Sequence, residues 1–256
     1  MLKVIACLTM LIDHVGYTFF PQHLWLRAIG RIAFPLFAWY VARGFARTRN
    51  RGRYLSRLVV WGLLSQLPFA LLFHGASFAR PASFLEGTNV LFTFAFALGG
   101  LWLIEACRGR HWSLQALSWA GYAAFGMAAE LARTDYGFYG VLMVLLCHAF
   151  GLKRAAGTTG MVTAGVDGAP AGKASLPENR WTMWNLLLPG SILALTFAFV
   201  ARGQMHPVQL LCAAAIPLLW LRLPDPAPGR WKYAFYAFYP LHILALYAIV
   251  VLLHGM

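Results

Sequence analysis

Charged residues are scarce in this chain. Asp, Glu, Lys and Arg together make up 11% of its 256 residues, whereas 60% are hydrophobic. Soluble domains carry a charge on about a quarter of their residues, so the composition excludes an ordinary water-soluble enzyme. Aromatic residues reach 15%, which excludes disorder for most of the chain. The sequence therefore predicts an integral membrane protein in which residues 1–256 form a single all-α, polytopic bundle of transmembrane helices.

The motifs of several enzyme classes are also missing. There is no H-E-x-x-H of a metalloprotease, no G-x-S-x-G of a serine hydrolase and no Walker A segment for ATP-driven work. The histidines do not gather at metal-ligand spacing, so no metal is expected. The 4 cysteines lie far apart in apolar segments, without a C-x-x-C pair. This pattern indicates buried thiols rather than a disulfide framework.

Acidic residues are few, 8 against 21 Lys and Arg, and the net charge is +13. A nucleic-acid-binding protein would gather its basic residues on a soluble face. Here they stand at the ends of hydrophobic runs, where they set the orientation of membrane helices. We therefore expect the lipid bilayer, with its anionic headgroups, as a partner, and no nucleic acid.

The apolar residues form runs that approach the roughly 20 residues needed for a transmembrane helix. Nine runs are predicted to cross the bilayer: 2–20, 29–46, 55–73, 89–107, 112–132, 137–152, 184–201, 205–222 and 232–253. With the N-terminus in the cytoplasm and the C-terminus outside, sixteen of the 21 basic residues fall on the inner side, which agrees with the positive-inside rule. Run 2–20 has no small-residue cleavage site before Pro21, so it is expected to be a retained helix rather than a signal peptide.

One polar stretch interrupts these runs. Residues 155–175 are rich in Gly, Ala and Thr and cannot bury a core. We expect a flexible cytoplasmic linker at about residues 153–183. The chain shows no internal repeat, which argues against a transporter built from inverted halves.

Ionisable groups inside the predicted spans are the strongest functional signal, because each costs a few kcal/mol in a bilayer and usually faces a cavity or a partner. Asp13 and His14 lie in the first span and His242 in the last. A neutral imidazole at such depth suits a general base, and a carboxylate could fix its tautomer. Neighbouring residues of a helix point ~100° apart, however, so Asp13 and His14 cannot address one spot directly. The alternative is a structural pair held between helices.

The last span carries an aromatic face around His242. Tyr236, Tyr239 and His242 recur every three residues, and Pro240 kinks the helix between them. An aromatic packing face with a hydrogen-bonded histidine explains this pattern as well as a reactive site does.

Basic residues suggest two binding regions. Arg27 and Arg31 are one helical turn apart and could hold a phosphate or carboxylate, although they could equally extend to outer headgroups. The dense basic run 42–57, with Arg43 and Arg47, is expected to serve mostly as a solvated, lipid-facing topology signal, and it would also attract an anionic cytoplasmic cofactor such as coenzyme A.

Further polar groups stand beside helix breaks and ends. Asp135, with Glu130, flanks a turn that contains Gly137 and Gly140, and Asn89 is a candidate N-cap. Together with Gln66 beside Pro68, they predict a polar cavity inside the bundle.

Six stretches of the chain resemble the TraX family: LKVIACLTMLIDHVGYTFFP, LRAIGRIAFPLFAWYVARGF, YLSRLVVWGLLSQLPF, NVLFTFAFALG, DYGFYGVLMVL and YAFYAFYPLH. The resemblance implies a polytopic acetyltransferase of the bacterial inner membrane that uses acetyl-CoA, as in the acetylation of the F-pilin amino terminus. By analogy with larger membrane acyltransferase families, it implies a catalytic His14 oriented by Asp13. His242, Arg27 and Arg31 would then line the passage of the acceptor or the acyl group.

The sequence thus predicts a nine-helix acetyltransferase acting on an amine or hydroxyl of an acceptor protein, sugar or lipid. Direct transfer and an acetyl-histidine at His14 both stay open. The oxyanion would be stabilised by Arg31, Tyr239 or a backbone N–H. A small transporter or flippase for an anionic solute is the main alternative, and a non-catalytic assembly protein is the third.

Overall fold

The helices alternate with short connections, and the bundle has no strands in the part of the chain that the structure describes. The structure, a computed structural model, describes residues 1–75, 81–159, 179–220 and 231–254. Its elements are α1 (Leu2–Phe19), α2 (Leu24–Gly30), α3 (Ala33–Arg47), α4 (Arg51–Phe73), η1 (Pro81–Leu85), α5 (Val90–Cys107), α6 (Trp112–Leu131), α7 (Gly137–Thr159), α8 (Asn179–Ala201), η2 (Pro207–Ala214), α9 (Ala215–Trp220) and α10 (Trp231–His254). The predicted all-α class is confirmed.

Within the described residues, four helices are long and apolar enough to cross a membrane. They are Leu2–Phe19, Arg51–Phe73, Val90–Cys107 and Tyr233–Leu253. Shorter apolar segments follow at Gly137–Phe150, Leu187–Ala201 and Pro207–Leu219. Together they make a multi-pass membrane protein, whose outward face on α4 carries exposed Leu63 and Leu64. The orientation of the termini stays a prediction.

Two predicted spans differ from the elements that form. Run 29–46 is interrupted after Gly30, so that α2 and α3 are separate helices joined at Arg31 and Ile32. Run 205–222 begins as the 3-10 helix η2 and continues as the short α9. Pro207 at the start of η2 and Pro217 within α9 remove backbone donors there. Of the predicted linker, residues 160–178 lie outside the described residues, whereas α7 and α8 cover its two ends.

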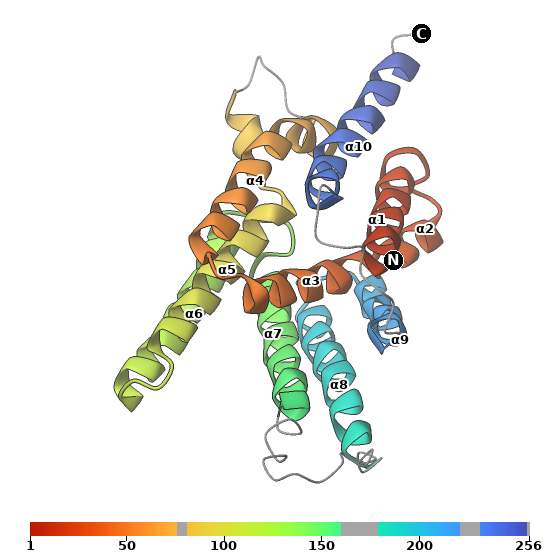
Figure 1. The fold of residues 1–256 in the computed structure, drawn as a ribbon. Coiled ribbons are helices and arrows are strands. Elements are labelled where there is room, and N and C mark those ends of the chain that lie inside the picture. Colours follow the sequence, from red (N-terminus) through yellow and green to blue (C-terminus); the bar gives the residue numbers. More distant parts are fainter. Residues whose placement is uncertain (76–80, 160–178, 221–230, 255–256) are drawn as a thin grey trace.

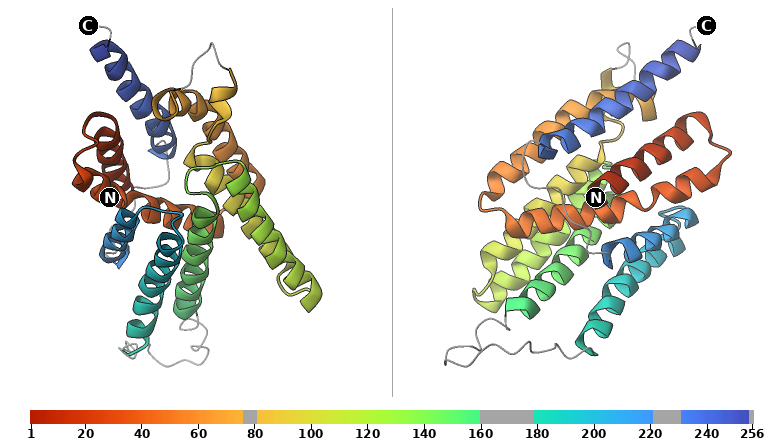
Figure 2. Two further views of the ribbon diagram at one scale, coloured as in Figure 1. Left: turned by 180° about the vertical axis from the view of Figure 1, so that it is seen from behind. Right: turned by 45° about the vertical axis from the view of Figure 1, so that its right-hand side comes forward.

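Helix α3 lies at the centre of the molecule (Figure 1), where it contacts α1, α5, α7 and α9. Its small and aromatic side chains fill the core, including the fully buried Ala38 and Phe45. Helix α10 packs on α4 and α1, and most long helices run side by side in the right-hand view of Figure 2. Helices α1 and α10 are therefore adjacent in space, although they lie at opposite ends of the chain.

The α5–α6 contact illustrates how the bundle packs. Without a hydrophobic driving force between helices, membrane helices associate where small residues allow close approach. A Cβ atom on Gly100 of α5 would come within 2.6 Å of a ring carbon of Tyr122 on α6. Tyr122 cannot move aside easily, because it is 2% exposed and its hydroxyl donates to the Val141 carbonyl at 2.7 Å.

We predict that Gly100→Ala destabilises the protein, by about 1–3 kcal/mol, because the new methyl group overpacks a filled interface. The matched control is Gly190→Ala in α8, where a Cβ meets nothing within 4 Å. That change should be neutral or slightly stabilising, since alanine favours helices. Thermal unfolding in detergent checks both variants, and equal stabilities would contradict the close α5–α6 packing.

Candidate functional site

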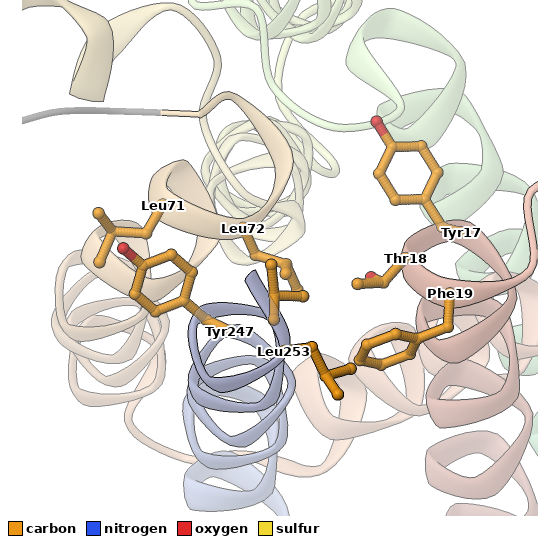
Figure 3. Close-up of a pocket in the computed structure, with 8 residues that line it drawn as sticks. Tyr17, Thr18, Phe19, Leu71, Leu72, Tyr247 and Leu253 are labelled. Carbon is orange, nitrogen blue, oxygen red and sulfur yellow. The ribbon is translucent and has the colours of Figure 1, made fainter. Parts of the chain in front are cut away.

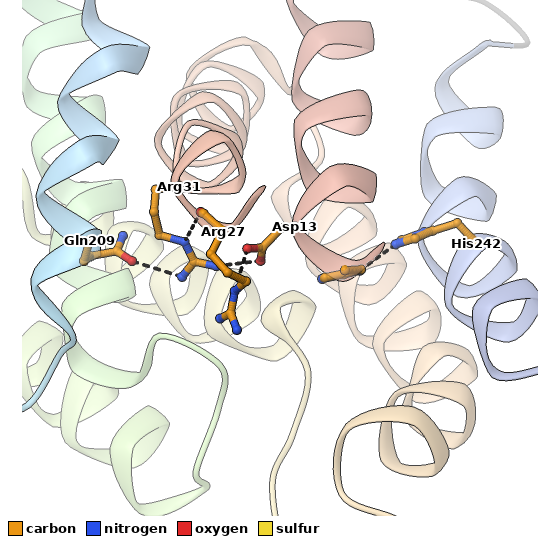
Figure 4. Close-up of polar contacts among 6 residues, drawn as sticks. Asp13, Arg27, Arg31, Gln209 and His242 are labelled. Atoms are coloured by element: carbon orange, nitrogen blue, oxygen red, sulfur yellow. Dashed lines mark hydrogen bonds and ion pairs between the residues drawn. The ribbon is translucent and has the colours of Figure 1, made fainter. Parts of the chain in front are cut away.

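His14 of α1 and His242 of α10 form a hydrogen bond between two helices. His14 Nδ1 lies 2.8 Å from His242 Nε2 (Figure 4). The two ring planes are only 10° apart and the ring centroids are 5.0 Å apart. The distance between the ring centroids is close to the N···N distance plus, for each ring, the distance from its centroid to its nitrogen. The hydrogen bond therefore runs close to the plane of both rings. A short bond close to the plane of both rings is a favourable geometry for an imidazole N–H that donates to an imidazole nitrogen.

A backbone carbonyl fixes the tautomers of this pair. His242 Nδ1 lies 2.7 Å from the Phe238 carbonyl oxygen, one turn earlier in α10. A carbonyl only accepts, so His242 Nδ1 carries a proton, and in the neutral ring His242 Nε2 is then the acceptor. His14 Nδ1 must donate to it, which leaves His14 Nε2 without a proton. The basic nitrogen of the neutral pair is therefore His14 Nε2.

Aromatic rings enclose the pair. Phe73 of α4 meets the His14 ring edge-on at 4.9 Å, and Phe238 lies nearly parallel to the His242 ring at 4.7 Å. Tyr239 meets His242 at 5.9 Å and is 6% exposed. These rings exclude water from much of the surroundings, and in a water-poor site electrostatic interactions are stronger.

Asp13 faces the other side of α1 and bridges two arginines (Figure 4). Its Oδ1 accepts from Arg27 Nε at 2.9 Å, and its Oδ2 accepts from Arg31 Nη2 at 2.5 Å. Arg31 Nη1 also donates to Gln209 Oε1 of η2 at 3.1 Å. One buried carboxylate thus ties α1 to α2 and, through Arg31, to η2. The sequence pattern gave no signal for Gln209.

Close approach of α1 and α2 makes these ion pairs possible. A Cβ atom on Gly30 would overlap the Asp13 side chain, and one on Gly16 would come within 2.5 Å of Leu26 Cβ. The glycines let the two helices meet at backbone distance, which places Arg27 and Arg31 beside Asp13.

The structure therefore separates the roles that the sequence suggested for Asp13 and His14. Asp13 contacts Arg27 and Arg31, and the partner of His14 is His242. The expected contact in which Asp13 orients His14 does not form. Neighbouring residues of a helix point ~100° apart, so the two side chains meet different helices. His242 takes the orienting position instead.

Asp135 lies in the α6–α7 turn, close enough to Arg31 and Arg27 for their charges to interact. The turn is fixed to the chain before α5: the Asp135 N–H donates to the Thr88 carbonyl at 2.7 Å, and the Thr93 hydroxyl donates to the Asp135 carbonyl. Tyr239 also interacts electrostatically with Asp135. Five residues singled out in the sequence, together with the two histidines, thus gather in one region: Asp13, Arg27, Arg31, Asp135 and Tyr239.

Asn89, Arg43 and Arg47 lie elsewhere. Asn89 is the N-cap of α5, as the sequence suggests, and its side chain accepts from the Leu91 N–H. Its amide nitrogen donates to the Gly62 carbonyl and to Gln66, so Asn89 is fully engaged in a structural network between α4 and α5. Arg43 and Arg47 lie near the C-terminal end of α3, away from the histidines.

Two cavities lie on either side of the histidine pair along α1 and α10, and neither has His14 or His242 among its lining residues. We call the first the Tyr54 cavity. It has a volume of about 260 Å³ and extends from Lys3 and Arg57 to Met10 and Tyr239. Met10 and Tyr239 each precede a histidine by about one turn.

The second, the Tyr247 groove, has a similar volume and lies between α1, α4 and α10 (Figure 3). Tyr17 and Thr18, about one turn after His14, line it together with Leu72 and Tyr247. His14 therefore lies about one turn of α1 from the lining residues of each cavity.

A metal has no ready ligand set in the described ranges, since no three His, Cys, Asp or Glu side chains come together there. A second ionisable group forms around Glu105, whose carboxylate lies 2.9 Å from Arg108 and 3.6 Å from His148. It lies at the far end of α5 and α7 and is separate from the histidine pair.

We predict that Asp13→Asn destabilises the fold by ~3 kcal/mol, because two arginines lose their partner in a poorly solvated site. Arg31→Gln should also destabilise, but the double variant should lose less than the sum, since both changes remove one interaction. Denaturant unfolding in detergent measures the cycle, with exposed Glu86→Gln as the control. An Asp13→Asn protein as stable as the wild type would contradict a structural role for Asp13.

Comparison with known proteins identifies the family. Residues 1–250 match the family described as TraX protein. The chain is 30% identical to the "Probable fimbrial assembly protein FimC, serogroup H1" of Dichelobacter nodosus, over 96% of this chain and 92% of that protein. It is 31% identical to "Protein TraX" of Escherichia coli over 57% of this chain, which spans about half (54%) of that relative. No solved structure matches. The chain belongs to the TraX family of multi-pass membrane proteins.

Proposed function

We propose that this protein is an acetyltransferase of the bacterial inner membrane, which moves an acetyl group from acetyl-CoA to an amine or hydroxyl. The observation that carries the proposal is the His14–His242 pair, because its hydrogen bonds leave one unprotonated imidazole nitrogen inside the bundle, about one turn of α1 from the lining residues of two cavities. Acyl transfer requires such a base to take the proton of the attacking group. The chain belongs to the TraX family, and the acetylase activity that this resemblance implies agrees with the same chemistry.

The acceptor nitrogen attacks the carbonyl carbon of the thioester. His14 Nε2 takes the proton that this nitrogen loses. A C–N bond forms, the C–S bond breaks, and the leaving thiolate receives the proton as free CoA. While His14 holds the proton, its positive charge is shared with His242 through their hydrogen bond. His242 in turn donates to the Phe238 carbonyl, so the charge is spread along a fixed chain of partners.

Tyr239 is the best placed of the oxyanion candidates. Arg31 is occupied by Asp13 and Gln209, whereas Tyr239 lines the Tyr54 cavity and contacts the His242 ring. Its hydroxyl would donate to the developing oxyanion.

The acceptor reaches the pair from the Tyr247 groove in this proposal. The groove is lined mainly by apolar side chains, and two helices that line it also carry the histidines. Because FimC is named for fimbrial assembly, the N-terminal amine of a pilus or fimbrial subunit is the first acceptor to test. An envelope sugar or lipid is the second.

We predict that His14→Ala lowers acetyl transfer by about 10²–10⁴-fold, the usual effect of removing a general base. The measurement is release of CoA from acetyl-CoA by the purified protein in detergent, with and without an acceptor peptide. His23→Ala is the matched control, because His23 is exposed in the α1–α2 connection. Wild-type binding and proton-coupled uptake of an anionic solute, without any acetyl transfer, would favour a transporter instead.

The role of His242 can be tested through the pH dependence of the reaction. The base must be unprotonated, so kcat/KM should fall as the pH decreases through the titration of the pair. His242→Ala should lower kcat and move this acid limb, and His242→Gln should restore part of the rate, because glutamine can still accept from His14. Unchanged pH profiles in both variants would contradict the orienting role. Radiolabel retained on protein that is rapidly denatured at neutral pH, and absent in His14→Ala, would indicate an acetyl-histidine rather than direct transfer.

A further inference from the structure

The Tyr54 cavity has a charged end and an apolar end. Lys3 and Arg57 lie at one end, and Met10, Leu91 and Phe94 line its body. It is bounded by α1, α3, α4, α5 and α10. A ligand that fits it must be slender, largely uncharged along its length and anionic at one end.

The two cations are notable for what they contact. Lys3 Nζ lies over the rings of Tyr40 and Phe235, at 5.0 and 5.5 Å, and the Arg57 guanidinium lies 5.5 Å from the Tyr54 ring. Among the residues that the structure describes, neither cation has a carboxylate within ion-pair distance, unlike Arg27, Arg31, Arg51 and Arg108. Arg57 Nε is moreover buried without an acceptor. A buried donor without a partner is costly, and a bound anion would satisfy it.

The length of the cavity can be compared with the helix that lines it. On α1 the cavity lining runs from Lys3 to Met10, ~10 Å at about 1.5 Å per residue, and His14 lies about one turn, ~6 Å, beyond Met10. A ligand that reached from Lys3 to His14 would span ~16 Å, about the extended length of a 4′-phosphopantetheine arm from its phosphate to its sulfur. A phosphate held at Lys3 and Arg57 would therefore place a thioester near Tyr239 and the histidine pair.

We propose that the Tyr54 cavity binds the phosphopantetheine arm of the thioester donor, with Lys3 and Arg57 as its phosphate ligands. The assignment rests on the proposed function. The charge and shape of the Tyr54 cavity suit a phosphate group attached to a slender chain. A phospholipid also carries a phosphate and is the competing ligand. The acyl donor is favoured because Met10 and Tyr239, which line the cavity, lie about one turn from His14 and His242, the reactive pair.

The test compares three donors that differ only beyond the pantetheine: acetyl-CoA, acetyl-4′-phosphopantetheine and acetyl-pantetheine. In the wild type, loss of the phosphate should raise KM by roughly 10–100-fold, as expected for charge-assisted hydrogen bonds. Arg57→Gln and Lys3→Gln should each raise KM for the two phosphorylated donors by roughly 10-fold and leave KM for acetyl-pantetheine and kcat nearly unchanged. Arg57→Lys should retain most of the affinity.

Arg53→Gln is the matched control, since Arg53 lies one turn earlier on α4 and is exposed. Thermal stabilisation by each donor, measured in parallel, reports binding without turnover and shows whether a variant is folded. Arg57→Gln with the KM values of Arg53→Gln would overturn the assignment, even if His14-dependent turnover supports the proposed function. A phosphatidylglycerol molecule retained in native mass spectra, lost in Arg57→Gln without any change in donor KM, would assign the site to lipid instead. A wild-type protein that turns over none of the donors would contradict the proposed function. The cavity assignment would then be tested by thermal stabilisation, which should be greater with the phosphorylated donors than with acetyl-pantetheine.

Discussion

The ion pairs of Asp13 with Arg27 and Arg31 fix the rotation of α1, and the rest of the site depends on that rotation. Because neighbouring residues on a helix point ~100° apart, turning Asp13 toward α2 turns His14 toward α10. Gly30 allows the close approach that makes the pairs. The ion pairs of Asp13 thus position the imidazole of the next residue, His14. Asp13 has a structural role, and His14 is the reactive group of the proposed function.

The position of the histidine pair relative to the two cavities explains how this fold could bring two substrates together. The Tyr54 cavity, with Lys3 and Arg57, lies before the pair along α1 and α10, and the apolar Tyr247 groove lies beyond it. Both are lined by α1, α4 and α10. In the proposed reaction the donor enters from the basic end, while an acceptor held in the membrane arrives through the groove. The two substrates then meet only at His14 and His242, where aromatic rings exclude water. Such an arrangement would favour transfer over hydrolysis.

Much of the fold followed from hydropathy, because long apolar runs have few alternatives in a bilayer. The break between α2 and α3 did not, since it depends on α2 packing against α1 through Gly16 and Leu26. Residues of the site were found as ionisable groups inside apolar runs, but their pairing was not. Sequence adjacency suggested that Asp13 orients His14, whereas the contact with His242 joins the first and last helices. Gln209 and the Phe238 carbonyl gave no signal, because their roles arise only from tertiary contacts.

The central claim is that His14 Nε2 is the basic nitrogen of the pair. Nitrogen-15 NMR of histidine-labelled protein in detergent tests it most directly, with the signals assigned by their loss in His14→Gln and His242→Gln. At neutral pH the account predicts that Nδ1 of both rings is protonated and that His14 Nε2 has the shift of an unprotonated nitrogen. A protonated Nε2 and an unprotonated Nδ1 on His14 would contradict the account, because no base would then be available to the acceptor.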